Sequence, residues 1–181
     1  MHTVFVISLA FLTTVSKAIK FRTCDYIPNR KVAEYKMALT KVIHQYTDAG
    51  FKTHCIYSDQ EFQPLPQYFK ETTLSIDFNL ASSNNHVPEV EQNNCTLQEQ
   101  MHATFHSLPL QAIPAIFIRY LASETAEKLK FFLEIGGVSS YYSLSEILIK
   151  QSLDYEKHYT IPQLSYLQAH QEPCPKNTQV S

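Results

Sequence analysis

Hydrophobic residues near the start of the chain lack the strict alternation of a half-exposed strand. Two segments, Val4–Val15 and Ala18–Ile27, are rich in β-branched and aromatic residues. This composition favours two strands that are covered on both faces. A turn is expected between them, near Ser16 and Lys17.

The next stretch changes from a helical to a strand-like pattern. Residues 30–49 place apolar side chains at steps of three and four, which predicts an amphipathic helix ended by Gly50. A short strand is expected over 51–58, a loop with a short helix over 60–72, and a half-buried, alternating strand over 73–81. A long helix between strands is typical of an α/β layered fold.

Two further helices are predicted in the second half, over 87–108 and 114–132. Pro88 lies in the first turn of the earlier one, where a missing N–H is tolerated. Its expected core stripe is Val90, Leu97, Met101, Phe105 and Leu108. From Gly136 onward no periodicity is sustained. We therefore predict a core over 1–132 and a loosely ordered tail over 133–181.

Composition narrows the function classes. The length of 181 residues suits one domain with a tail. Only three glycines occur, too few for a P-loop or a dinucleotide-binding glycine motif. The 15 Lys and Arg against 17 Asp and Glu give a net charge of −2, so no bulk attraction to nucleic acid or to an anionic membrane is expected.

The cysteines and the N-terminal segment leave an alternative open. Cys24, Cys55, Cys95 and Cys174 lack the short spacings of a zinc site. They fit either free thiols or two disulfides in a secreted protein. The apolar run Val4–Leu12 resembles a signal-peptide core, although no Lys or Arg precedes it, and it is too short to span a bilayer as a helix. A small secreted protein that has lost residues 1–18 is one alternative.

Two acidic residues are candidates for chemistry. Asp59 follows a predicted strand, and Glu91 lies in the first turns of a predicted helix. Strand ends and helix starts meet at the edge of an α/β sheet, where two carboxylates can hold Mg²⁺ or Mn²⁺. A pair of such ions about 4 Å apart can promote phosphoryl transfer. The plainer alternatives are a turn residue and a glutamate that complements the helix dipole.

Several segments resemble the catalytic core of copia-type retrotransposon integrases, which are parts of retrovirus-related Pol polyproteins. The segments are FKTHCIYSDQEF at 51–62 and NLASSNNHVPEVEQNNCTLQEQMHATFHSLP at 79–109. Residues 129–159 and 167–179 resemble the stretch that joins integrase to reverse transcriptase. The resemblance implies an α/β, RNase H-like mixed sheet with flanking helices, truncated at the first strand. It also implies metal-dependent DNA integration in an intracellular, nuclear setting.

The resemblance assigns site residues one at a time. Asp59 falls on the second catalytic Asp and Glu91 on the catalytic Glu, with Glu89 as the alternative. Both would be ligands of Mg²⁺ or Mn²⁺. The first catalytic Asp falls on His2, and imidazole is a poorer partner for Mg²⁺ than a carboxylate. We therefore expect an integrase remnant that is inactive and that binds no metal or binds it poorly.

DNA is the partner that the resemblance implies, but the sequence predicts a weak contact. Residues 71–118 contain no Lys or Arg. The positions that are basic in the family are here Gln92, Cys95, Gln98, Gln100 and His102. Each phosphate neutralised by Lys or Arg adds affinity, so this helix should bind DNA poorly. The DNA-contacting residues, the oligomeric state and a third possibility, a domesticated non-catalytic binding module, stay open.

Overall fold

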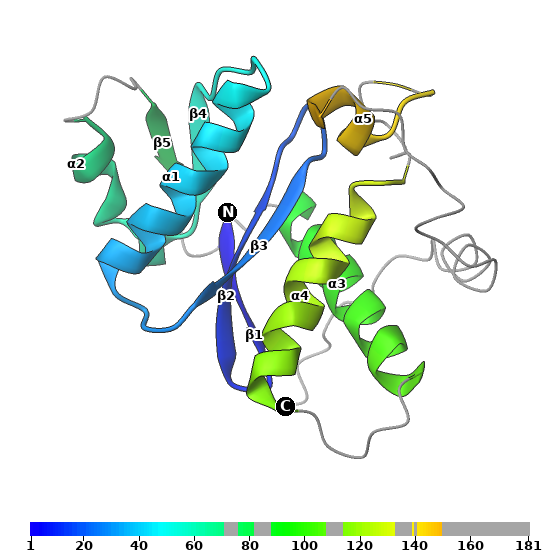
Figure 1. The fold of residues 1–181 in the computed structure, drawn as a ribbon. Coiled ribbons are helices and arrows are strands. Elements are labelled where there is room, and N and C mark those ends of the chain that lie inside the picture. The colour runs from blue at the N-terminus through cyan, green and yellow to red at the C-terminus, as the bar shows by residue number, and fades with distance from the viewer. Residues whose placement is uncertain (71–75, 82–87, 108–113, 133–138, 140, 150–181) are drawn as a thin grey trace.

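The computed structural model describes residues 1–70, 76–81, 88–107, 114–132, 139 and 141–149 (Figure 1). An antiparallel sheet holds β1 (His2–Val6), β2 (Leu9–Val15) and β3 (Arg22–Ile27) in that order. A parallel pair holds β4 (Cys55–Ser58) and β5 (Asp77–Leu80). The amine of Met1 donates to the carbonyl oxygen of Tyr57 at 2.6 Å, so the start of β1 lies beside β4. The strands thus follow the spatial order β3-β2-β1-β4-β5.

Helices lie on both sides of the strands (Figure 1). The described helices are α1 (Val32–Asp48), the 3₁₀ turn η1 (Gln60–Phe62), α2 (Leu65–Lys70), α3 (Pro88–Ser107), α4 (Ala115–Leu129) and α5 (Leu144–Ile149). Strands come first, then a helix, then strands again, and then the long helices α3 and α4. This order makes a mixed α/β molecule.

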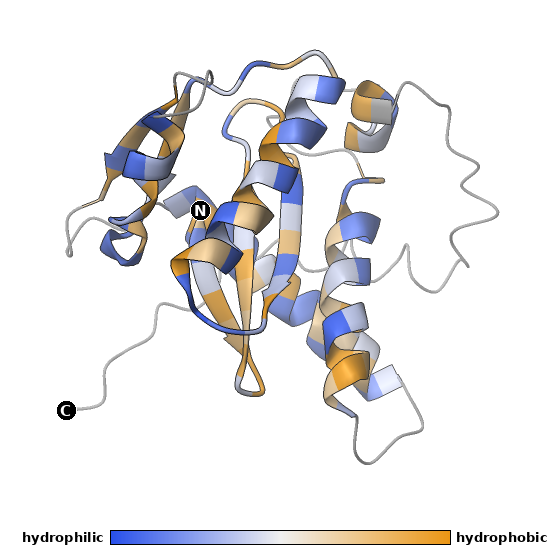
Figure 2. Ribbon diagram, turned by 60° about the vertical axis from the view of Figure 1, so that its left-hand side comes forward, coloured by the Kyte–Doolittle hydropathy of each residue, from blue (hydrophilic) through white to orange (hydrophobic). Residues whose placement is uncertain are grey.

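β2 is the centre of the molecule because its side chains enter two cores. Leu12 packs with residues of α1 and α2, such as Leu39 and Leu65. Its neighbour Phe11 packs on the opposite face with residues of α3 and α4, such as Leu97 and Ala122. Hydrophobic residues run along these strands in Figure 2. The prediction of a strand covered on both faces is confirmed for β2, whereas Phe5 of β1 is 51% exposed.

The boundary between the first two strands was predicted incorrectly. The hydrophobic pattern predicts one strand over residues 4–15, but a hairpin turn at Ile7 and Ser8 divides them into β1 and β2. Both turn residues have positive φ, 46° and 67°. Turns of this kind normally use Asn and Gly, because other residues tolerate positive φ poorly. The sequence therefore lacks the usual signal for this turn.

The other predicted elements occur, mostly with shorter bounds. α1 and α4 lie inside the predicted ranges 30–49 and 114–132, and Gly50 has a φ of 86° after α1. The predicted strand 51–58 is reduced to β4, whose pairing with β5 begins at Cys55 opposite Asp77. β5 and α3 occupy the described parts of 73–81 and 87–108, while Leu74 and Leu108 lie outside the described residues. β1 is short, yet it pairs with β2 along its whole length.

A helix forms within the predicted tail. α5 buries Leu144, and its residue Ser145 donates its backbone N–H to the carbonyl oxygen of Lys130 at 3.0 Å. α5 is thereby attached to the end of α4. Residues 150–181 lie outside the described residues, so the division of the chain at residue 132 stays a prediction.

The states of the described cysteines and the hydropathy of the described helices concern the alternative of a secreted protein. Cys24 is a buried free thiol and Cys55 an exposed one, whereas Cys95 is disulfide-bonded. Among the described cysteines, the structure thus contains both states that the sequence left open. Among the helices that the structure describes, none combines the length and the hydropathy needed to cross a bilayer.

Candidate functional site

His2 and Asp59 face each other although 57 positions separate them. His2 is the first residue of β1, and Asp59 follows the last residue of β4. The Nδ1 atom of His2 lies against the Oδ2 atom of Asp59, forming a hydrogen-bonded pair. Their side chains are 40% and 30% exposed, so the pair lies at the surface end of the two strands. The structure therefore brings together the first two positions that the integrase resemblance assigned.

The backbone beside this pair is fixed by the first residue of the chain. Met1 is 6% exposed, and its amine is bonded to Tyr57, two residues before Asp59. Burial lowers the pKa of this amine to about 6, although the negative charge of Asp59 acts in the opposite direction. The Met1 contact aligns β1 with β4 and so sets the distance between His2 and Asp59.

A second network holds the turn that carries Asp59. In η1, the Glu61 carboxylate accepts hydrogen bonds from the Arg30 guanidinium and, at 3.2 Å, from the Tyr35 hydroxyl. The Tyr35 hydroxyl lies 3.1 Å from the hydroxyl of Thr3 on β1. Burial alone would raise the pKa of Glu61, but these hydrogen bonds and the charge of Arg30 outweigh it and lower that pKa. Glu61 therefore joins the Asp59 turn to both α1 and β1.

Phe62 strengthens the same attachment. Its side chain is 1% exposed, and its ring meets the Tyr35 ring edge-on with centroids 5.2 Å apart. Such aromatic pairs contribute roughly 0.5–1.5 kcal/mol beyond their buried area. The glutamate–phenylalanine pair that follows Asp59 is thus a positioning device for the Asp59 turn.

Glu91 and Glu89 both lie in the first turn of α3. The buried face of this helix contains Val90, Asn94 and Leu97, which leaves Glu91 exposed and Glu89 half-buried. Either carboxylate complements the positive end of the helix dipole. Among the described residues, no three His, Cys, Asp or Glu side chains gather as metal ligands would, so Glu91 does not complete such a group with His2 and Asp59. The catalytic and metal-binding roles of Asp59 and Glu91 stay predictions.

Thr13 and Asn94 connect α3 to the strand that carries His2, and the sequence analysis missed both. The Thr13 hydroxyl donates to Oδ1 of Asn94 at 2.7 Å and lies 3.1 Å from the carbonyl oxygen of His2. Thr13 is fully buried and Asn94 is 9% exposed. One signal was available, because Asn94 falls on the apolar stripe between Val90 and Leu97. A polar side chain in such a stripe needs a buried partner.

The residues present do not fit the pair of Mg²⁺ or Mn²⁺ ions that the resemblance implies. Among the residues that the structure describes, this site has one carboxylate, from Asp59, and its neighbour is the imidazole of His2. Mg²⁺ prefers oxygen ligands, and an imidazole cannot bridge two ions as a carboxylate can. What the pair can do is exchange a proton or bind a polar group at the surface, since both side chains are partly exposed.

Comparisons with known proteins support the fold but give no closer relationship. No protein-family model matches the chain, and no curated protein sequence matches it either. Among solved structures, the catalytic core domain of BIV integrase is similar, with a TM-score of 0.55 and 15% sequence identity. The match covers 87% of this chain and 95% of that domain. At this identity the likeness shows the fold alone, and the predicted RNase H-like α/β fold is confirmed.

Proposed function

We propose that this chain is a degenerate integrase core of copia-type origin. Its ancestral reaction would be metal-dependent DNA strand transfer, which this chain no longer carries out. The observation that carries the proposal is the contact between His2 and Asp59. A scaffold that aligns these two positions from distant parts of the chain fits an ancestral carboxylate pair in which one partner has been replaced.

The replacement accounts for the proposed loss of activity. An acidic residue at position 2 would place two carboxylates side by side at the ends of β1 and β4, where they could share a divalent cation. With His2 at this position, one negative charge is lost, and the Nδ1 atom of His2 is hydrogen-bonded to one carboxylate oxygen of Asp59. We expect Mg²⁺ or Mn²⁺ to bind weakly here, if at all.

Strand transfer provides the direct test. The purified chain is incubated with Mn²⁺ and labelled donor DNA, with Asp59→Ala as the reference. We expect no more product from the wild-type chain than from Asp59→Ala. A product that forms with the wild-type chain and disappears in Asp59→Ala would contradict the proposed inactivity.

Metal binding tests the ancestry without depending on activity. The variant His2→Asp restores a carboxylate beside Asp59, so we expect its affinity for Mn²⁺, measured by calorimetry, to exceed that of the wild-type chain. His2→Asn is the matched control, because it has a similar shape without the charge. If Mn²⁺ binds no better to His2→Asp than to His2→Asn, or if Asp59→Ala leaves the gain intact, the assigned pair is not an ancestral metal site.

The copia-type origin can be tested in the genome. We expect reverse-transcriptase sequence and terminal repeats on either side of the open reading frame. An isolated frame without these neighbours would favour the domesticated binding module instead. The proposal also includes an intracellular, nuclear location for this protein.

The packing of residues 1–18 supports this proposal over the secreted alternative. These residues form β1 and β2, whose side chains Phe11 and Leu12 are fully buried in the two cores. Removal of a signal peptide ending near Ala18 would delete both strands. N-terminal sequencing of the expressed protein separates the alternatives, because a start near Ile19 would contradict the integrase-core proposal.

A further inference from the structure

The cysteines of this chain are not all in the same oxidation state. Cys24 on β3 and Cys55 on β4 are free thiols, whereas Cys95 on α3 is disulfide-bonded. The sequence contains four cysteines, and the remaining one is Cys174, which lies outside the described residues. Within this chain, Cys95 can therefore pair only with Cys174.

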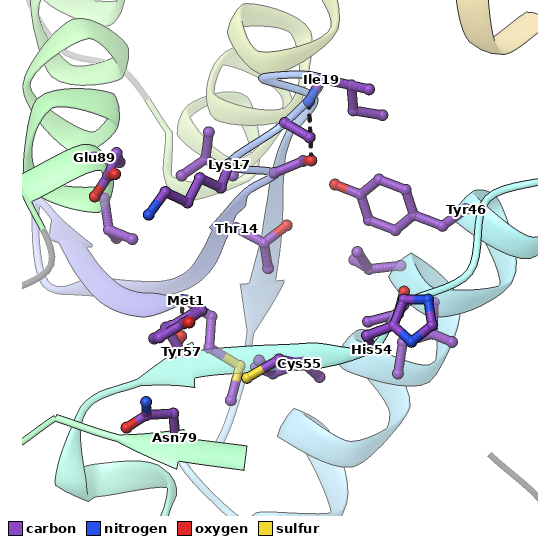
Figure 3. Close-up of a pocket in the computed structure, with 18 of the residues that line it drawn as sticks. Met1, Thr14, Lys17, Ile19, Tyr46, His54, Cys55, Tyr57, Asn79 and Glu89 are labelled. Atoms are coloured by element: carbon purple, nitrogen blue, oxygen red, sulfur yellow. Dashed lines mark hydrogen bonds between the residues drawn. The ribbon is translucent and has the colours of Figure 1, made fainter. Parts of the chain in front are cut away.

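The two free thiols differ in their contact with the solution. Cys24 is 8% exposed and belongs to the core that α3 and α4 cover. Cys55 is exposed and lines an open pocket beside Met1 and Tyr57 (Figure 3). In a thiol assay, Cys24 therefore reports on whether the core is intact, and Cys55 shows the reactivity of an open thiol.

Cys95 lies at the edge of the buried face of α3. The buried residues of this helix include Val90, Leu97 and Met101. Cys95 itself is half-buried, and its Sγ atom lies 3.4 Å from Oε1 of the exposed Glu99. The helix is thus held by its apolar face and not by its disulfide. Breaking the disulfide should release the partner segment without unfolding α3.

The described chain ends close enough to Cys95 for this bond. α3 and α4 pack on each other and run in opposite directions, so the end of α4, to which α5 is attached, lies beside the first half of α3 (Figure 1). Cys174 follows Ile149, the last residue of α5, by 25 residues. Such a length can extend to roughly 80 Å. The 20 residues of α3 span only about 30 Å, so the segment reaches Cys95 easily.

We propose that a disulfide between Cys95 and Cys174 fastens the C-terminal segment 150–181 to α3, and that thiol reductants open it. The bond closes a covalent loop that contains the second half of α3, α4 and α5. Disulfides that are open to solvent are more easily reduced than buried structural ones. In a reducing compartment this fastening would be reversible, whereas a secreted protein would keep it closed. The inference does not rest on the integrase ancestry.

The opening reaction is thiol–disulfide exchange with a small thiol such as glutathione. A glutathione thiolate attacks one sulfur and forms a mixed disulfide, while the other cysteine leaves as a thiolate and takes up a proton. A second glutathione thiolate attacks the mixed disulfide and releases the remaining cysteine. Two glutathione thiols are thereby oxidised to one glutathione disulfide, and Cys95 and Cys174 are reduced to thiols.

Peptide mapping tests the pairing directly. The full chain is purified without reductant, its free thiols are alkylated in urea, and it is digested with trypsin. Because trypsin cleaves after Lys and Arg, Cys95 falls in peptide 71–119 and Cys174 in peptide 158–176, and neither peptide contains another cysteine. We expect these two peptides to be joined, in a protein that is a monomer on a non-reducing gel. Alkylated Cys95, or two copies joined through Cys95, would overturn the proposal.

Serine variants supply a matched comparison. Cys174→Ser removes the proposed partner, and Cys55→Ser is the control, because it removes a thiol that takes no part in the bond. The number of thiols that react in urea should rise by one in Cys174→Ser and fall by one in Cys55→Ser, relative to the wild type. If Cys174→Ser does not expose Cys95, then Cys95 has another partner and the proposal fails.

Glutathione buffers test the reversible opening. The protein is equilibrated at increasing ratios of reduced to oxidised glutathione and then cleaved briefly with trypsin. When the bond is closed, the piece that begins at residue 158 should stay joined to the rest on a non-reducing gel. When the bond is open, or in Cys174→Ser at every ratio, that piece should separate.

The opening must occur in the folded protein. We expect the circular dichroism spectrum to be unchanged across these buffers and Cys24 to stay unreactive toward iodoacetamide, because the core does not depend on the disulfide. If the bond opens only when urea unfolds the chain and makes Cys24 reactive, it is a fixed crosslink, and the proposed reversible fastening is wrong.

Discussion

The hydroxyl of Thr13 holds α3 against the strand that carries His2. Replacing it by the isosteric Thr13→Val leaves Asn94 buried without its donor. A buried polar group that loses its partner costs about 1–3 kcal/mol. We therefore expect the free energy of unfolding, measured by urea denaturation, to fall by that amount.

The control for this substitution is Thr96→Val on α3, the helix that carries Asn94. Its hydroxyl bonds to the carbonyl oxygen of Gln92 within α3 and is not fully buried. Its loss should change the free energy of unfolding by less than about 0.5 kcal/mol. Equal effects of Thr13→Val and Thr96→Val would mean that the contact between β2 and α3 adds no stability.

Cys24 and Cys55, which are both free thiols, should differ strongly in reactivity. Burial, followed by the charge of Asp25, raises the pKa of Cys24 to about 12, so at pH 7–9 this residue stays a neutral thiol. Thiolate is the reactive form, and Cys55 is exposed. With iodoacetamide and peptide mapping by mass spectrometry, Cys55 should be alkylated well before Cys24 at pH 8. If Cys24 and Cys55 are alkylated at comparable rates in the native protein, and Cys24 reacts as fast there as in urea, then Cys24 is not buried in solution.

Single residues near the site differ in how far the sequence could predict them. Asp59 could be named as a candidate because it follows a predicted strand and matches a motif, and its role stays a prediction. The role of Glu61 could not be predicted, because its partners Arg30 and Tyr35 lie some thirty positions earlier and reach it only through the packing of α1. Thr13 is a similar case, since a threonine in a buried strand gives no sign of its partner.

At the scale of elements, the turn between β1 and β2 carries backbone strain. Ile7 and Ser8 both have positive φ, and such residues cost of order 1–3 kcal/mol each. The double variant Ile7→Asn with Ser8→Gly supplies the residues that this turn prefers. Since Ile7 is 69% exposed, little packing is lost. We expect the free energy of unfolding to rise by about 1 kcal/mol.

The control for the turn is Ile7→Val, which keeps a β-branched residue at the strained position. It should leave the stability measured by thermal and urea denaturation nearly unchanged. If the double variant is no more stable than Ile7→Val, the turn does not have the strained conformation that its φ values indicate.

Gly50 ends α1 at a φ of 86°, and no atom lies within 4 Å of the position that a Cβ would occupy. The cost of Gly50→Ala is therefore conformational rather than steric, about 1–2 kcal/mol. Gly50→Asn should cost less, because asparagine tolerates this conformation at helix ends. Urea denaturation of both variants checks the order, and an alanine variant as stable as the asparagine one would contradict it.

Helices and strands could be predicted well where one of their faces is polar, and their bounds were ambiguous where neither face is polar. The amphipathic pattern placed α1 within two residues of its start and one of its end. The strand β2 is buried on both faces and β1 is largely apolar, although Phe5 is 51% exposed, so the apolar pattern is continuous and hides the turn between the two strands. The signal for that turn was also absent, because Ile7 and Ser8 are not typical turn residues.

At the scale of the whole molecule, the pairing of distant segments determines the candidate site. The contact between His2 and Asp59 depends on β1 lying between β2 and β4, an order that no local pattern contains. The resemblance to integrases supplied only an RNase H-like mixed sheet as an expectation, and the likeness to the BIV integrase core supports the same fold.

Charge distribution over the whole surface gives the last prediction, that this chain binds DNA weakly. The stretch 71–118, which includes α3, contains no Lys or Arg, and the net charge is −2. The double variant Gln98→Lys with His102→Lys adds two positive charges to the α3 face that also carries Glu91. If that face is an ancestral DNA contact, affinity for a fluorescent duplex should rise. The slope of log K against log salt concentration should also steepen by up to about 1.8, since each phosphate contact adds roughly 0.9.

The matched control places the same two charges on α4, as Ile116→Lys with Tyr120→Lys. Both residues are exposed, 52% and 70%, so the fold should tolerate the change. Net charge alone would make the two double variants bind DNA equally, whereas a DNA-facing α3 would favour the first. Equal affinity and equal salt slopes would therefore argue against α3 as the ancestral DNA contact. They would leave the fold unaffected, because none of the four positions belongs to either core.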